Sequence, residues 1–390
     1  MAIRRKLIAG MTGLLGFMLS GLVQAASELN MRPGVTETSI EVYELHMMVV
    51  WVMVAISVVV FGAMFYSFIF HRKSKHPTPA TFSHSTKMEI VWTAIPVLIL
   101  IYLTVPAVKL LIKMEDASNS DMSVQVTGSQ WKWHYKYLEN DIIEQEISFY
   151  SNLSTPREQY ENYETSGAAE NVNYLLEVDN HLVLPVDTKV RFLVTAEDVI
   201  HSWWVPELAV KKDAIPGFIN ETWTKVPTPG IYRGQCTELC GVNHGFMPVV
   251  VEVLSKPDFA KWLSGKAEEK RIADKTAAAA ASQNWDMDKL MVLGKTVYDA
   301  KCAACHQVNG AGLPPVFPAL KGSAIATTGP VEGHIDIVVN GKQGTAMAAY
   351  GAQLTDAEMA AVITYERNAW GNDTGDKVQP ADIQAFKAGN

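Results

Sequence analysis

Two long apolar segments dominate the first third of the chain. Met47–Phe70 carries no charged residue over 24 positions, and Ile90–Val108 carries none over 19. At 1.5 Å per residue, either segment can cross the roughly 30 Å hydrocarbon core of a membrane as a helix. The pattern therefore predicts a transmembrane hairpin within residues 26–112, with helices at about 46–70 and 90–112.

A shorter apolar segment precedes this hairpin. Arg4, Arg5 and Lys6 are followed by an apolar run to Val23 and by small residues that end at Ala25. This order is typical of a signal peptide, so we expect cleavage to remove residues 1–25. The alternative is a retained first membrane anchor, which the interspersed glycine and hydroxyl residues disfavour.

The charges around the two long apolar segments differ in sign. The connection between them, residues 71–87, contains basic residues and no acid, whereas four glutamates precede the first segment. By the positive-inside rule, the connection is expected in the cytoplasm. Both ends of the mature chain then lie outside it, and residues 113–390 form an exported module.

Short β-branched and aromatic runs follow the apolar segments. Their alternation and the turn residues between them predict an all-β antiparallel sandwich or barrel over residues 113–262. The polar segment 151–173 is expected to be a surface insertion. The runs are Ser123–Thr127, Tyr174–Val178, Lys189–Val194 and Pro248–Val253.

The last third of the chain returns to helical patterning. Residues 263–285 mix alanine with lysine and glutamate and are expected to be a linker, either helical or disordered. Residues 286–390 predict a small all-α domain. Its last helix is expected near Thr355–Asn368, because Thr355 and Glu358 form a capping-box pattern.

Charge and cysteine usage narrow the function. The chain has 33 Lys and Arg against 41 Asp and Glu, a net charge of -8, with no basic stretch. Nucleic acid is therefore excluded as a partner. The four cysteines fall into two close pairs, which leaves none for a dispersed disulfide framework and favours a bound metal or cofactor.

The first cysteine pair belongs to a segment rich in soft donors. Cys236, Cys240, His244 and Met247 lie within twelve residues. Thiolate, imidazole and thioether ligands favour copper over magnesium or calcium. A mononuclear blue-copper loop needs one cysteine, so the second suggests that both sulfurs bridge two coppers. The alternative is a disulfide or a zinc site, in which Met247 would have no role.

A second histidine ligand is expected from another strand. His201, in the segment Glu197–Trp204, is the best placed, because a strand 35 residues before Cys236 can lie alongside the loop. A lone histidine is more often structural than a ligand, and His181 and His134 are the alternatives.

The second cysteine pair forms Cys302-Ala-Ala-Cys305-His306, the attachment pattern of a c-type haem. Haems that transfer electrons commonly have methionine opposite histidine. Met347, in a glycine-rich loop, is favoured as this ligand over Met359, which falls inside the predicted last helix. The domain resembles class I cytochrome c, although Ala348 stands where proline often follows the axial methionine.

From about Glu41 to Trp262 the chain resembles subunit II of haem-copper cytochrome c oxidase. The resemblance implies a cupredoxin-like sandwich outside the membrane that holds a dinuclear copper centre, CuA. The segments that carry it are Val91–Thr93, Gly128–Trp133, Glu177–Asn180, His201–Trp203, Asp213–Gly217 and Cys236–Met247.

This resemblance assigns roles to individual residues. Cys236 and Cys240 would bridge the coppers, and the Glu238 carboxylate would reach a magnesium ion shared with subunit I. The remaining copper ligands would be His201, His244, Met247 and the backbone carbonyl of Glu238.

Two further residues gain a role from the resemblance. Trp131 would be the site where electrons enter CuA, and Glu89 would lie at the mouth of a proton path. By composition alone, Trp131 is an ordinary buried aromatic and Glu89 a solvated charge at a helix end.

The expected function is electron transfer in an aa-type terminal oxidase of a bacterial inner membrane. Electrons would pass from cytochrome c through the fused haem c to CuA and on to subunit I, where oxygen is reduced to water and protons are pumped. Subunit I and subunit III are the expected partners, with cytochrome c or a quinol–cytochrome c reductase as donor. One alternative is the CuA-bearing subunit of a nitric oxide reductase. The other is a membrane-tethered copper chaperone, which predicts a thioredoxin-like βαβ pattern and one anchor.

Overall fold

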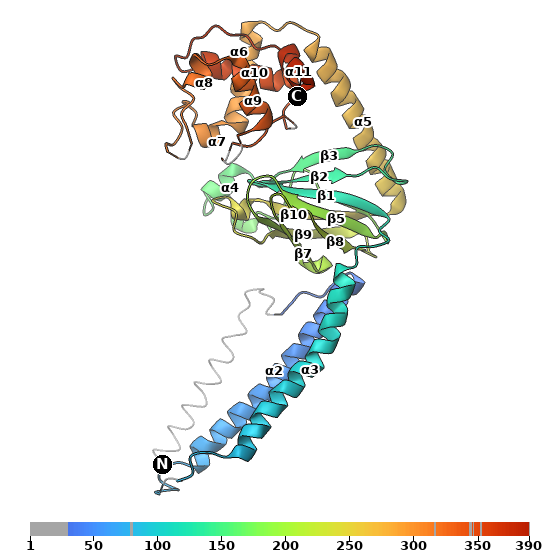
Figure 1. The fold of residues 1–390 in the computed structure, drawn as a ribbon, viewed down its shortest axis with the longest axis vertical. Helices are drawn as coiled ribbons and strands as arrows, with labels where there is room; N and C mark the ends of the chain where they lie inside the picture. Colours follow the sequence, from blue (N-terminus) through green and yellow to red (C-terminus); the bar gives the residue numbers. More distant parts are fainter. Residues whose placement is uncertain are drawn as a thin grey trace. The chain divides into compact units, whose positions relative to one another are not determined.

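The computed structural model describes residues 30–78, 81–315, 317–342, 345, 347–351 and 353–389. The signal peptide expected at residues 1–25 lies outside these ranges. The described chain divides into two compact units, residues 30–115 with 206–209 and residues 116–205 with 210–389. Figure 1 shows their elements coloured along the sequence.

The first unit is a hairpin of two long helices, α2 (Glu37–Phe70) and α3 (Thr86–Glu115). Thr36 caps α2 through a reciprocal capping box. Apolar side chains are exposed along most of the length of both helices. Lys113, near the end of α3, forms ion pairs of 2.8 Å with Glu37 and Glu41 at the start of α2. The two predicted membrane-spanning helices are therefore confirmed.

The second unit begins with a β-sandwich of two five-stranded sheets. Their strand orders are β3-β2-β1-β5-β8 and β4-β10-β9-β6-β7. The strands are β1 (Met122–Ser129), β2 (Lys132–Tyr137), β3 (Ile147–Ser151), β4 (Leu182–Pro185), β5 (Val190–Ala196), β6 (His201–Val205), β7 (Val210–Ala214), β8 (Asn220–Thr224), β9 (Gly230–Cys236) and β10 (Pro248–Leu254). The short helices between strands are α4 (Arg157–Glu161), η1 (Ala168–Glu170), η2 (Pro206–Leu208) and η3 (His244–Phe246).

The sandwich is mixed rather than antiparallel throughout. β1 pairs parallel with β5, and β10 pairs parallel with β4. Alternation of buried and partly buried residues, as along β5, identifies a strand but does not reveal the direction of its neighbour. The core between the sheets contains fully buried aromatic side chains, including Trp133, Tyr135 and Trp203.

One predicted strand, Tyr174–Val178, is wrong. Leu175 has φ of 57° and lies in a turn, in which the amide of Tyr174 donates to the carbonyl of Asn171. The strand of this region is β4 instead, which follows at Leu182. A mainly apolar run of five residues is too short to distinguish a strand from a turn with partly buried side chains.

A single helix, α5 (Lys256–Ala281), follows the last strand. Ser255 caps it, and Trp262 packs against the sandwich aromatics Tyr137 and Phe149 and against Phe259 of its own helix. The helix continues through most of the segment expected to be a linker. Of the two alternatives for that segment, helical or disordered, the structure has the helix.

The C-terminal region is helical. Gly294 of α6 lies so close to α10 that a Cβ atom there would collide with the carbonyl oxygen of Ala361. Thr355 and Glu358 form the expected capping box. The helix that they begin is not the last one, however, because α11 starts at Pro380, a residue that favours the first turn of a helix. The helices are α6 (Met287–Lys301), α7 (Ala303–His306), α8 (Ala324–Thr327), α9 (Val331–Asn340), α10 (Asp356–Asn368) and α11 (Pro380–Gly389).

Candidate metal and haem sites

Two paired strands bring the first metal-ligand candidates together. β6 begins at His201 and β9 ends at Cys236, and the two strands pair antiparallel with Trp203 opposite Cys236. Alternate residues of a strand share a face, so His201 lies on the same face as Trp203. The Nδ1 atom of His201 is 4.0 Å from the Cys236 sulfur.

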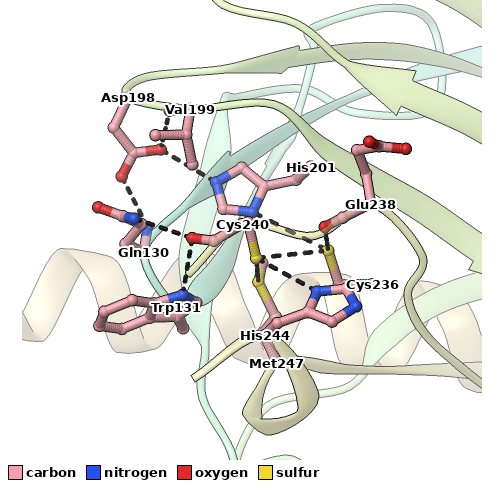
Figure 2. Close-up of polar contacts among 10 residues, drawn as sticks. All are labelled: Gln130, Trp131, Asp198, Val199, His201, Cys236, Glu238, Cys240, His244 and Met247. Carbon is pink, nitrogen blue, oxygen red and sulfur yellow. Dashed lines mark hydrogen bonds and ion pairs between the residues drawn. The ribbon is translucent and has the colours of Figure 1, made fainter. Parts of the chain in front are cut away.

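The loop between β9 and β10 supplies the other candidates. The sulfurs of Cys236 and Cys240 are 3.8 Å apart. Cys240 Sγ lies 3.4 Å from Nδ1 of His244 and 3.6 Å from Sδ of Met247. The Glu238 backbone carbonyl faces Cys236 Sγ at 3.4 Å (Figure 2). The structure thus brings together all six groups that the sequence singled out.

The chemistry of this donor set fits copper. Both cysteines are free, and a sulfur separation of 3.8 Å is far longer than the about 2.05 Å of a disulfide. His201, Cys236 and Cys240 place their ligand atoms within 4.8 Å of one another, and all three are buried. Buried thiols, imidazoles and a thioether are ligands that soft metal ions prefer.

Burial and hydrogen bonding set the acidity of these groups. Burial lowers the pKa of His201, but hydrogen bonds with Asp198 and Cys236 outweigh it and raise that pKa to about 9. Burial would raise the pKa of Cys236, but hydrogen bonds, first with His201, lower it to about 7. Burial, and then the charge of Cys236, raises the pKa of Cys240 to about 12. Cys236 is therefore the readier of the two thiols to become a thiolate ligand.

Asp198 was not singled out from the sequence, yet it holds His201 in place. Its Oδ1 atom lies 3.0 Å from Nε2 of His201, and its Oδ2 atom accepts a 2.7 Å hydrogen bond from the amide of Gln130. With Nε2 engaged in this way, Nδ1 of His201 faces the sulfurs. A carboxylate behind a ligand histidine commonly fixes its orientation. In the sequence, only the position of Asp198 three residues before His201 could have indicated this role.

Glu238 and Glu89 lie outside the sulfur cluster. The Glu238 side chain is exposed, and Figure 2 shows its carboxylate directed away from the sulfurs. Glu89 is exposed in the first turn of α3.

The second cysteine pair lines a cavity of about 500 Å³ in the C-terminal region, within the usual range for cofactor pockets. Cys302, Cys305 and His306 lie on its wall, and Met347 lines it as well. Met359 is instead fully buried in the core of α10. Two thiols, a histidine and a methionine around a largely apolar cavity fit a covalently attached haem.

The orientation of His306 is fixed by the backbone. Its Nδ1 atom lies 2.9 Å from the carbonyl oxygen of Pro318, which assigns the ring proton to that nitrogen. Nε2 is then the ring nitrogen that can bind iron.

These features define a class of protein: a membrane-anchored, cupredoxin-like domain with a copper-type donor set, fused to a cytochrome c-type domain. Three family models match the chain. They are the transmembrane domain of cytochrome c oxidase subunit II over residues 24–110, its periplasmic domain over 122–254, and subunit III of cbb3-type cytochrome c oxidase over 291–365. The chain belongs to the cytochrome c oxidase subunit II family, whose members are components of the oxygen-reducing oxidase.

Three proteins illustrate what the chain is similar to. The probable cytochrome c oxidase subunit 2 of Rickettsia bellii is 39% identical over 258 residues, which are 65% of this chain and 91% of the relative. Subunit 2 of Cyanidium caldarium is 37% identical over 225 residues, or 58% of this chain and 85% of the relative. The periplasmic domain of the Bradyrhizobium japonicum subunit is 37% identical, with a TM-score of 0.33, over 39% of this chain and 98% of that domain.

The fold overturns one alternative function. A copper chaperone predicts a thioredoxin-like βαβ pattern and one anchor, whereas the exported cysteine loop here belongs to a β-sandwich and follows two apolar helices. The family likewise gives the subunit a two-pass membrane location with a periplasmic domain.

Proposed function

We propose that this subunit receives electrons at a haem c in its C-terminal domain and delivers them through a dinuclear CuA centre to subunit I, where oxygen is reduced to water with proton pumping. The observation that carries this proposal is the convergence of two thiols, two imidazoles and a thioether, of which all but the His244 imidazole are buried. Cytochrome c or a quinol–cytochrome c reductase would be the donor, and subunit III a further partner, in a bacterial inner membrane.

The chain's own residues would organise the copper pair. Cys236 and Cys240 would bridge the metals, because their sulfurs are near each other and each faces a different histidine. Met247 and the Glu238 carbonyl, each beside one sulfur, would complete the ligand set. When bound, such centres exchange one electron at a time. The exposed Glu238 carboxylate is free to reach a magnesium ion at the boundary with subunit I.

The haem residues have equally distinct roles. Cys302 and Cys305 would form the thioethers, and His306 would bind iron through Nε2, since Nδ1 is engaged with Pro318. Met347 would be the opposite ligand because it lines the cavity, whereas Met359 packs in the core.

Trp131 and Glu89 would serve the transfer of electrons and protons. The Trp131 indole N–H donates to the Cys240 carbonyl, which supports a role as the site where electrons enter CuA. Glu89 is the acid in the first turn of the second spanning helix, which supports a role at the cytoplasmic mouth of a proton path.

A matched pair of cysteine variants tests the proposal in the purified oxidase. Cys240→Ser should abolish the paramagnetic resonance pattern of one electron shared by two copper nuclei and leave the covalent haem intact. Cys302→Ser should damage haem attachment and leave the copper pattern intact. A wild-type pattern from a single copper nucleus, or a shared pattern that survives Cys240→Ser, would contradict the bridging roles.

A further inference from the structure

A buried acid–base pair lies beside the cysteines of the C-terminal cavity. Nε2 of His334, on α9, is 2.8 Å from Oε2 of Glu366, on α10. Their side chains are only 3% and 5% exposed. Both residues line the same cavity as Cys302 and His306. The two residues are 32 positions apart in sequence. Neither has a role in the proposed electron path.

The pair is not saturated by hydrogen bonds. Nδ1 of His334 is buried and has no hydrogen-bond partner among the described residues. A buried polar atom left without a partner destabilises the folded state, so a structure that retains it calls for an explanation. An imidazole that is bonded on one side and open on the other can gain or lose a proton without breaking its bond to Glu366.

Other titratable groups surround Glu366 from neighbouring elements. In addition to burial, the Glu366 carboxylate raises the pKa of Tyr298 and of Cys302, at the end of α6, and the pKa of Tyr350, in the loop between α9 and α10. Lys301 and Lys342 line the cavity. The cation next in sequence, Arg367, is instead bonded to Asp376 and to the carbonyls of Ile325 and Gly329. His334 is thus the basic group in direct contact with Glu366.

We propose that His334 and Glu366 form a redox-linked proton site, which binds one proton from solvent when the adjacent haem c accepts one electron and releases it when the haem is oxidised. This inference rests on the haem c of the proposed function. The electron comes from the one-electron donor, and the proton binds to the pair, whose charge changes from minus one to zero. Reduction removes one positive charge from the iron, and charges interact strongly in an apolar cavity with little water.

Proton uptake makes the haem potential depend on pH. As the pH rises, the reduced state loses the proton that stabilises it, so the potential falls. One proton per electron gives at most a slope of about 59 mV per pH unit. The slope flattens at low pH, where the pair is protonated in both oxidation states, and at high pH, where it is protonated in neither.

Potentiometric titration of haem c in the assembled oxidase tests this inference, with the haem followed by its own visible absorption band between about pH 5.5 and pH 9. Glu366→Gln and His334→Gln should each flatten the slope. Glu332→Gln, which removes an exposed carboxylate from the same helix as His334, should leave the slope unchanged.

The possible outcomes separate the inference from the proposed function. A wild-type potential that does not vary with pH overturns the proton site, and so does a slope that survives in both variants. Absence of covalent haem from the wild-type chain overturns the proposed function itself. If a variant does not retain haem, the comparison rests on the other variant and on the proton uptake of the wild-type oxidase when its haem c is reduced, followed with a pH-indicator dye.

Discussion

The indole N–H of Trp131 donates a hydrogen bond to the backbone carbonyl oxygen of Cys240 over 3.1 Å. The side-chain amide of Gln130 donates to the same oxygen over 2.9 Å. A carbonyl oxygen has two lone pairs, and both are used here. The aromatic ring is therefore fixed to the residue that carries one of the two clustered sulfurs (Figure 2).

Replacing the aromatic ring should slow electron transfer without altering either centre. We expect Trp131→Leu to reduce the rate at which CuA accepts electrons from haem c, while the copper and haem spectra stay those of the wild type. Stopped-flow absorbance of each centre measures this. Gln130→Ala is the control, because it removes a donor to the same carbonyl and keeps the ring. If both variants slow electron transfer equally, the cause is the lost hydrogen bond to the Cys240 carbonyl rather than the loss of the indole ring.

Removing the carboxylate behind His201 should weaken copper binding. We expect Asp198→Ala to lower copper affinity about 10- to 100-fold, as is typical for the loss of a group that orients a ligand histidine. Competition with a chelator of known affinity measures the change. Glu197→Gln removes the neighbouring carboxylate and should have little effect. Equal losses in the two variants would indicate a general electrostatic cause.

The same carboxylate gives the domain an acid-sensitive contribution to stability. Burial raises the pKa of Asp198, but hydrogen bonds from His201, Gln130 and Val199 outweigh it and lower that pKa below its usual value. The stabilisation is therefore complete above about pH 4 and is lost as the pH falls further. In acid unfolding, Asp198→Asn should remove part of the drop in stability seen over this window.

The two methionines of the C-terminal domain should respond differently to substitution. Met347→Ala should lower the haem potential and remove the weak far-red absorption of a thioether–iron bond, because a thioether ligand raises the potential. Met359→Ala should leave both unchanged and cost about 2–5 kcal/mol of stability through a core cavity. Potentiometry and thermal unfolding separate the two effects. The reverse result would make Met359 the ligand.

Arg367 should prove essential for the stability of the C-terminal domain. Its guanidinium is buried and donates to Asp376 and to two backbone carbonyls. Arg367→Met leaves these acceptors unpaired. Each buried unpaired acceptor lowers the free energy of unfolding by about 1–3 kcal/mol, so the melting temperature should fall by several degrees. Arg271→Met, at an exposed site on α5, should leave the melting temperature nearly unchanged. A similar loss in both variants would contradict this role.

Local signals identified most of the copper-site residues. All but His201 lie within twelve residues, so their convergence follows from one loop. His201 required only that its strand lie beside the loop, and the β6–β9 pairing provides this. The apolar helices were predictable for the same reason, because each is one uninterrupted segment.

Features that depend on register or on distant partners were not predictable. The His334–Glu366 pair joins two helices whose separate patterns give no sign of the contact. The parallel pairing of β1 with β5 is set by chain connections rather than by alternation. The contact of Asp198 with the ring of His201 depends on the geometry at the start of β6, which the sequence does not reveal.

Because α5 is a continuous helix of 26 residues, its number of residues sets both how far it extends and the rotational position at which it ends. Adding one residue to a flexible connection changes its reach only slightly. Adding one residue to a helix turns everything beyond it by about 100° and moves it by about 1.5 Å. An insertion of about seven residues, close to two whole turns, would keep the rotational position of the residue at which α5 ends, whereas an insertion of one or two residues would not.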